Sequence, residues 1–223
     1  MVGVGQMIKT IKTCVALLET TEQSKNLNIQ HLRGFIGYLF LEDAEFHHHN
    51  VNSYHYPLVQ YKKIDEKPAI LGLQDYAEIL MKKISIVDSI TTPNSTIKIT
   101  ATNLKFSTTE LKEAKTLFEF TTPWIALNEE NYKLYKKFNA VEKKKLLEKI
   151  LIGNVLSALK GLGILVDYKI TAEIIDYKPV SVNAHDNFFQ GFKAHFILNI
   201  NLPELIGLGK SVSKGFGTIR RLT

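Results

Sequence analysis

Residues 54–73 read YHYPLVQYKKIDEKPAILGL, and this stretch decides the fold. Apolar and polar residues partly alternate from Tyr54 to Ile64, which is typical of a strand because successive strand side chains point to opposite faces. The polar stretch 65–68 then signals a turn ahead of the short apolar run Ala69–Leu73. The whole stretch therefore predicts a β-hairpin.

The segments on either side of this hairpin predict one helix and one strand each. Before it, residues 8–19 are rich in Ile, Val, Thr and Leu and predict a strand, and Asn28 is a helix cap for an apolar periodicity that runs to about Leu41. After it, residues 73–83 predict a helix, and residues 84–106 predict extended chain with a break at 92–94. The order is that of a ferredoxin-like, or RRM-like, βαββαβ unit.

The second half of the chain repeats this order with longer helices. We expect a strand at 116–125, helices at 128–138 and 141–160, paired strands at 164–177 and 191–200, and a glycine-rich loop at 207–217 before a last short strand. The expected fold class is therefore α+β, with two tandem ferredoxin-like domains side by side, residues 1–106 and 107–223.

Composition narrows the class of protein. Of 223 residues, 45% are hydrophobic, which is enough to bury a core. Lys and Arg number 28 against 22 Asp and Glu, and the resulting net charge of +6 favours a polyanionic partner. Cys14 is the only cysteine, so an intrachain disulfide and a cysteine-based metal site are excluded. A single cysteine fits the reducing cytoplasm best, and no apolar run is long enough to span a membrane, so we expect a soluble, cytoplasmic protein.

Histidines cluster just after the first predicted helix. His47, His48, His49 and His55 are four of the seven histidines in the chain. On an extended backbone His47 and His49 share one face while His48 points away. Two imidazoles on one side can act as base and acid near neutral pH, as RNA cleavage by a neighbouring 2′-hydroxyl requires.

Two other interpretations of these histidines stay open at this point. They are equally consistent with solvated loop residues that have no chemical role. A His-x-His pair also binds zinc or iron when a distant third ligand, such as His185 or Asp186, completes the site. Metal binding is less favoured because the H-E-x-x-H pattern and paired cysteines are both absent. We therefore expect neither a metal nor another cofactor.

A glycine-rich stretch near the end of the chain is the second candidate site. Four glycines allow sharp turns and a close approach of backbone amides to a phosphate. Lysines and serines add donors in the same short stretch. The alternative is a glycine-rich hairpin without a ligand. The candidate RNA-binding residues here are Gly207, Gly209, Lys210, Ser211, Ser213, Lys214, Gly215 and Gly217.

Residues 132–160 form a third, basic and aromatic feature. Such a stripe neutralises an RNA backbone in some proteins. Interspersed glutamates make a solvated helix face the favoured interpretation. We expect Trp124, in the stretch TPWIAL (122–127), to belong to the core.

The chain resembles the CRISPR-associated endoribonucleases that cut repeat RNA, in the type I-B branch, over nearly its whole length. The segments that carry the resemblance are LRGFIG (32–37), YPLVQYK (56–62), TPWIALN (122–128) and LPELIGLGKSVSKGFG (202–217), of which the last is the most specific. The resemblance implies two ferredoxin-like folds side by side, a catalytic histidine after the first helix and a glycine-rich loop that contacts RNA.

Carried over to this sequence, the resemblance implies that His47 and His49 share the acid and base work. Because three histidines stand in a row, His48 is a third candidate catalytic residue, and which of the three is base and which acid stays open. Arg33 is a secondary candidate for phosphate contact, and Tyr38, Tyr54 or Lys62 is a candidate for an additional tyrosine or lysine near the site.

The function implied is metal-independent cleavage of precursor CRISPR RNA within its repeats. Repeat RNA is the expected partner; subunits of a type I effector complex and a second copy of the chain are further candidate partners, and no membrane is involved. Two alternatives stay open: a non-catalytic RNA-binding subunit of an effector complex, and a metal-dependent hydrolase that uses His47 and His49 as ligands.

Overall fold

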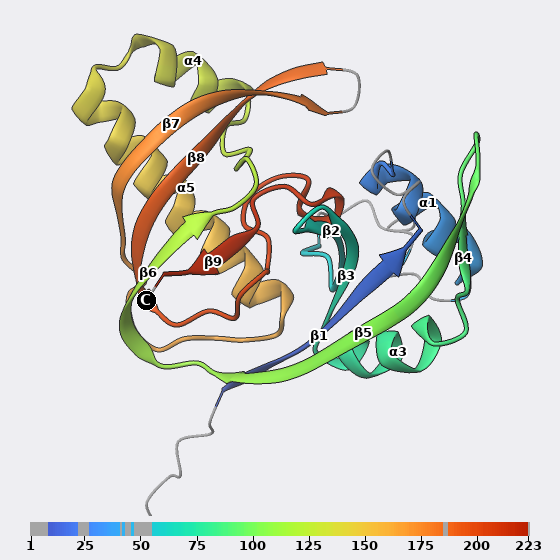
Figure 1. The fold of residues 1–223 in the computed structure, drawn as a ribbon. Helices are drawn as coiled ribbons and strands as arrows, with labels where there is room; N and C mark the ends of the chain where they lie inside the picture. The colour runs from blue at the N-terminus through green and yellow to red at the C-terminus, as the bar shows by residue number, and fades with distance from the viewer. Residues whose placement is uncertain are drawn as a thin grey trace, which may run out of the picture.

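The structure, a computed structural model, describes residues 9–21, 27–40, 42, 46, 55–184 and 187–222. These residues form two β-sheets, one in each half of the chain, and the long strand β5 sweeps across the molecule to connect them (Figure 1). Each sheet carries its own helices, so the protein is of the predicted α+β class.

The first half has the predicted order of elements. They are β1 (Thr10–Thr20), α1 (Ile29–Leu39), β2 (Val59–Ile64), β3 (Lys67–Leu73), α3 (Asp75–Ile84), β4 (Ser89–Thr91) and β5 (Thr96–Glu110). The sheet order is β2-β3-β1-β5-β4, with every pair antiparallel. Strand β5 takes the fourth position of a ferredoxin-like sheet, and β4 is a short additional edge strand.

Local interactions explain why the first helix and the hairpin form where they do. The side chain of Asn28 accepts a hydrogen bond from the backbone amide of Gln30, as a helix cap does. Asp65 and Glu66 have φ angles of 47° and 62°, the conformation that a two-residue hairpin turn requires. The predicted hairpin is confirmed, although its turn is shorter than expected because residues 67 and 68 already belong to β3.

The second half has the same sheet order in a different set of strands. Its elements are β6 (Glu113–Phe120), α4 (Glu129–Lys137), α5 (Ala140–Gly161), β7 (Ala172–Ala184), β8 (Asn187–Ile200), η2 (Val212–Lys214) and β9 (Ile219–Arg221). The order β7-β8-β6-β9 corresponds to β2-β3-β1-β5 in the first half.

Two predicted strands of the second half were placed wrongly. The strand expected at 116–125 is β6 and ends at Phe120, and the strand expected at 164–177 is β7 and begins only at Ala172. Ile164 and Ile170 are buried outside any strand. Buried loop residues are apolar, as buried strand residues are. An apolar run therefore does not show where a strand begins, and the predicted strand was too long. The domain junction expected at 106/107 falls inside β5, and its position stays a prediction.

The second half departs from the expected βαββαβ order between β8 and β9. A ferredoxin-like fold has its second helix at this point, but residues 201–218 contain only the single 3₁₀ turn η2. Gly209, Gly215 and Gly217 have φ angles of 100°, 88° and 61°, which no α-helix contains. The predicted glycine-rich loop at 207–217 is therefore confirmed, and the helices predicted at 128–138 and 141–160 are α4 and α5.

The core of the second half forms around Trp124 and α5. Helix α5 begins with a capping box made by Asn139 and Glu142. It ends where the amide of Ile164 donates to the carbonyl of Leu159 beyond Gly163, the Schellman arrangement. Trp124 is 0% exposed, so its assignment to the core is confirmed.

None of the described helices has both the length and the apolar character needed to cross a membrane.

Candidate functional site

The glycine-rich segment, residues 207–218, is docked on the first half of the molecule. The amide of Gly207 donates to Gln60 Oε1 at 2.9 Å, and the hydroxyl of Tyr56 donates to the carbonyl of Gly207 at 2.8 Å. At the other end of the segment, Lys62 Nζ donates to Thr218 Oγ1 at 3.1 Å. Strand β2 and the residues just before it therefore hold both ends of the segment.

The glycines of this segment are required by close packing. A Cβ atom on Gly209 would lie 2.7 Å from two atoms of the Trp124 indole, and one on Gly217 would overlap the carbonyl oxygen of Leu208. Both residues also have positive φ angles, which glycine adopts without strain. The segment is thus a fixed structural element with one defined path between the two halves.

Several backbone amides of the segment donate to groups outside it. Those of Lys210 and Gly217 donate to the carbonyls of Ile125 and Pro123, at 3.1 and 2.9 Å. The segment was expected to offer amides to phosphate. Within the described residues, the amides of Ser211 and Ser213 make no hydrogen bond, so any such role rests on the turn at η2.

Lys62 is buried at the centre of this docking contact. Its side chain is 1% exposed, and burial lowers its pKa to about 7. Thr218 Oγ1, which accepts from Lys62, itself donates to the carbonyl of Gly215 at 3.1 Å. The hydroxyl of Thr122 donates to the same carbonyl at 2.7 Å. Lys62 is therefore one end of a hydrogen-bond network that fixes Gly215.

Tyr61 contacts both the glycine-rich segment and Phe46, the residue just before the histidine segment (residues 47–55). Its hydroxyl donates to the carbonyl of Phe46 at 3.4 Å, and its own carbonyl lies 3.1 Å from where a Cβ on Gly215 would stand. Burial raises the pKa of Tyr61, so its hydroxyl stays protonated and donates. Phe46 is itself fully buried, in the core of the first half.

Two cationic side chains lie around this junction. The charge of Arg33, on α1, acts on both Tyr61 and Lys214. Burial lowers the pKa of Lys214, and the neighbouring Arg33 lowers it further. An anion bound between the two side chains would interact favourably with both charges. Arg33 and Lys214 therefore form a candidate phosphate site.

Lys210 lies in different surroundings from Lys214. Its Nζ atom donates to the carbonyl of Leu127 at 3.0 Å, next to the start of α4, and burial lowers its pKa. The two lysines of the segment thus face different parts of the molecule, although the sequence placed them only four positions apart.

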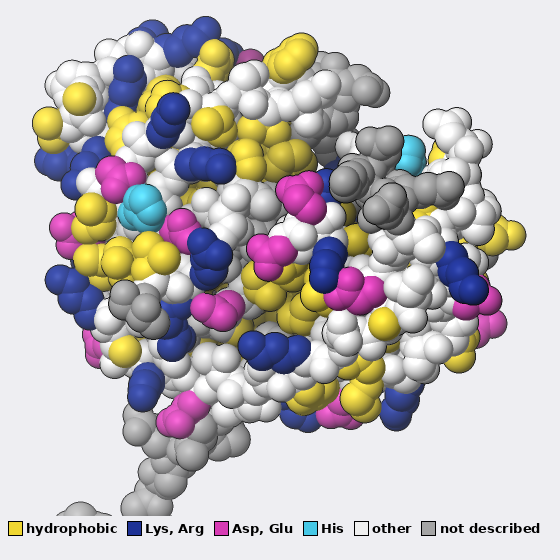
Figure 2. Space-filling model, viewed as in Figure 1, with side chains coloured by type: hydrophobic (Ala, Val, Ile, Leu, Met, Phe, Trp, Pro, Cys, Tyr) yellow, Lys and Arg dark blue, Asp and Glu magenta, His cyan; other side chains and the backbone are white. Residues whose placement is uncertain are grey.

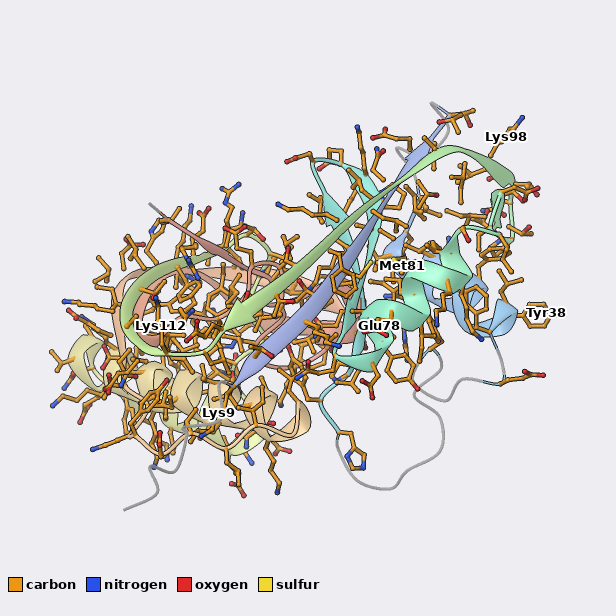
Figure 3. The ribbon with its side chains drawn as sticks, turned by 90° about the horizontal axis from the view of Figure 1, so that it is seen from below. Lys9, Tyr38, Glu78, Met81, Lys98 and Lys112 are labelled. Atoms are coloured by element: carbon orange, nitrogen blue, oxygen red, sulfur yellow. The ribbon has the colours of Figure 1, made fainter. Side chains whose placement is uncertain are left out.

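Several predicted residues are not assembled at this site. The side chain of Tyr38 is 74% exposed and points outward from the end of α1 (Figure 3). Residues of the histidine segment and the proposed third metal ligands lie outside the described part of the chain; they are His47, His48, His49, Tyr54, His185 and Asp186. Among the described residues, no group of three or more His, Cys, Asp or Glu side chains is arranged to bind a metal ion.

The basic and aromatic feature of residues 132–160 is a helix surface. Lys136 and Lys143 lie over the rings of Tyr132 and Tyr135, with Nζ 4.5 and 5.0 Å from the ring centroids. Lys133 pairs with Glu129 one turn earlier. On the face shown in Figure 2, cationic side chains are likewise interspersed with anionic ones. These contacts favour the interpretation as a solvated helix face.

Sequence reasoning missed Tyr61 and Gln60. Both lie in the quoted stretch YPLVQYK (56–62), where the residues appeared only as a strand pattern. Their burial on a strand next to a second domain was the missing information. The available signal was a glutamine and a lysine two positions apart on one face of a predicted strand, both of which the structure shows to be buried with partners.

Comparisons with known proteins agree over the whole chain. A family model described as the Cas6b N-terminal domain matches residues 9–110, and one described as the Cas6b C-terminal domain matches residues 110–222. An uncharacterized protein of Methanocaldococcus jannaschii is 43% identical over 119 residues, which are 53% of this chain and 81% of that protein.

Solved structures are similar to the entire fold. A crystal structure of Cas6b has a TM-score of 0.83 and 29% identity, and covers 96% of this chain and 100% of its own. A crystal structure of the CRISPR RNA processing endoribonuclease Cas6b has a TM-score of 0.76 and 26% identity, with the same coverage.

Proposed function

The chain belongs to the Cas6b family, and we propose that it is a metal-independent endoribonuclease that cuts precursor CRISPR RNA within its repeats. The family models account for both halves of the chain, so the assignment does not depend on one domain. The resemblance found in the sequence to repeat-RNA endoribonucleases is thereby confirmed at the level of the family.

One observation supports placing the chemistry at the junction of the two halves. The hydroxyl of Tyr61 holds the carbonyl of Phe46, and the carbonyl of Tyr61 lies against Gly215. His47 is covalently attached to Phe46. Thus one buried residue contacts both the glycine-rich segment and the residue that precedes the proposed catalytic histidines.

The proposed reaction is an internal transesterification. One imidazole of His47 or His49 removes the proton from a 2′-hydroxyl, and the 2′-oxygen attacks the adjacent phosphorus. The bond from phosphorus to the 5′-oxygen breaks, and the other imidazole delivers a proton to that oxygen. The products are a 2′,3′-cyclic phosphate and a 5′-hydroxyl. His48 lies between the two and has no assigned role.

Cationic groups of the junction would stabilise the charge that develops on the phosphate. Arg33 and Lys214 are the candidate pair, because the charge of Arg33 acts on both Tyr61 and Lys214. Donors that are already in position stabilise a transition state without reorganising. Lys210, Ser211 and Ser213 would contact phosphates further along the strand.

The decisive experiment incubates the purified protein with its own repeat RNA in excess chelator. We expect cleavage in chelator, and no cleavage of RNA that carries a 2′-deoxy substitution at the cut site. Loss of cleavage in chelator would indicate the metal-dependent hydrolase instead. Salt-sensitive binding without any scission would indicate the non-catalytic RNA-binding subunit.

We further propose that the protein acts in the cytoplasm and there binds repeat RNA. Transfer of the product to subunits of a type I effector complex and formation of a homodimer stay predictions. Co-purification with those subunits tests the first, and light scattering with and without repeat RNA tests the second.

A further inference from the structure

A cleft of about 630 Å³ lies beside the glycine-rich segment, on the side that Lys210 faces. Its lining comes mainly from α5, the start of α4 and the loop that connects β8 to β9, which are the elements to follow in Figure 1. Its lining residues are Tyr56, Ala126, Asn128, Asn131, Ile150, Asn154, Ser157, Gly209 and Lys210. The reaction proposed above does not use it.

Most of the polar side chains that line this cleft are uncharged. Asn154 Oδ1 accepts from the Trp124 indole at 2.9 Å, and Asn128 Oδ1 accepts from the amide of Asn131, so their NH₂ groups are what they can offer a ligand. Within the described chain, the side chains of Asn131 and Ser157 make no hydrogen bond. Among the described residues that line the cleft, none is a carboxylate and Lys210 is the single cation.

This combination fits a nucleobase better than a phosphate. Phosphate sites are built from arginine and lysine, whereas amide side chains form paired hydrogen bonds with the edges of bases. Single-stranded RNA is recognised by bases that leave the stack and present both their edges and their flat apolar faces. Tyr56, Ala126 and Ile150 supply apolar surface, and the amides and Ser157 supply partners for an edge.

The cleft also adjoins the docked end of the glycine-rich segment. Tyr56 lines the cleft and donates its hydroxyl to the carbonyl of Gly207, and it directly follows His55 in the chain. We propose that the cleft binds one unpaired nucleobase of the repeat RNA. This inference rests on the proposed function, because it takes the ligand to be that RNA.

The test measures the Kd of uncleavable repeat RNA, 2′-deoxy at the cut site, for the whole protein. Each nucleotide flanking the cut is replaced in turn by an abasic one. The variant Asn131→Asp exchanges a donor for a charged acceptor in the first turn of α4, where an acidic residue suits the helix. Asn94→Asp, on the exposed β4–β5 turn, is the charge-matched control.

We expect Asn131→Asp to raise the Kd about tenfold, the discrimination that one amide–base pair supplies. For the wild-type protein, one abasic position should raise the Kd by a similar factor. For Asn131→Asp, the abasic substitution at that same position should raise the Kd no further, because the contact is already lost. The effects of Ser157→Ala and of that abasic substitution should likewise not add. The cleft proposal is overturned if Asn131→Asp binds like Asn94→Asp, or if its effect adds to that of every abasic position.

This test separates the two proposals. Coupling between Asn131 and one base, in a protein that does not cut natural repeat RNA, would overturn the endoribonuclease assignment and support the cleft. Cleavage without any coupling would overturn the cleft alone. Failure to bind repeat RNA would overturn both.

Discussion

The two halves of the molecule share a sheet order and differ in one connection. In the first half, α3 connects β3 to β4 and buries Ala77, Leu80 and Ile84 against its own sheet. In the second half, residues 201–218 make the equivalent connection with only one 3₁₀ turn. The helix completes its own domain, whereas the glycine-rich segment bonds both to its own half, at Pro123 and Ile125, and to the first half.

This difference shows where the site comes from. Contacts from Tyr56, Gln60 and Lys62 hold the glycine-rich segment against β2 and the residues before it. Those residues also follow the histidine segment in the chain. The sequence of the regular half thus contains the proposed catalytic groups, and the irregular half supplies the segment that docks on β2.

The largest expected effect comes from forcing a side chain into the irregular connection. Gly217→Ala should lower the free energy of unfolding by about 4 kcal/mol, because the positive φ and the overlap with the Leu208 carbonyl both oppose a Cβ. Gly153→Ala, on α5 with no atom within 4 Å of the new Cβ, should raise it by about 0.5–1 kcal/mol. Urea unfolding measures both. Equal stabilities would show that the segment is not fixed as described.

The next effect separates the buried lysine from an exposed one. Lys62 has a pKa of about 7 in the folded protein and 10.5 as its ordinary value, so the unfolded chain binds more protons between these pH values. Stability contributed through Lys62 therefore rises as the pH increases from 7 to 10 and is constant below 7.

From pH 7 to 10 the wild-type free energy of unfolding should rise by about 2 kcal/mol more than that of Lys62→Met. This value is smaller than the full pKa difference would give, because water that reaches the buried ammonium lowers the cost of its charge. Lys98→Met is the control, because Lys98 is exposed and far from the docking contact (Figure 3). Urea unfolding across this pH range gives the slopes. Parallel slopes for wild type and Lys62→Met would mean that Lys62 is solvated.

The smallest effect concerns positioning across the junction. Tyr61→Phe removes the hydroxyl that holds the Phe46 carbonyl, a hydrogen bond worth about 1 kcal/mol. The single-turnover rate of cleavage should fall about fivefold to tenfold while the Kd for uncleavable RNA stays unchanged. Tyr38→Phe, at an exposed tyrosine, should change neither. A rise in Kd without a change in rate would place Tyr61 in RNA binding instead.

The same comparison explains which features were predictable from the sequence. Periodicity, the Asn28 cap and the turn at Asp65 reflect contacts between near neighbours, and these predictions were confirmed. The docking of Gly207 on Gln60 joins residues 147 positions apart, and no local pattern records such a contact. For the same reason, one glycine-rich loop with two lysines appeared as a single site, although Lys210 and Lys214 face different partners.

The most direct test of the account is the cleavage rate of His47→Ala/His49→Ala, measured in single turnover with excess enzyme and chelator. The rate should fall by at least about 10²-fold, the usual effect of losing a general acid or base, while uncleavable repeat RNA is bound with unchanged Kd. His48→Ala is the matched control and should cut at nearly the wild-type rate. Cleavage by the double variant at the wild-type rate would contradict the assignment of catalysis to this segment.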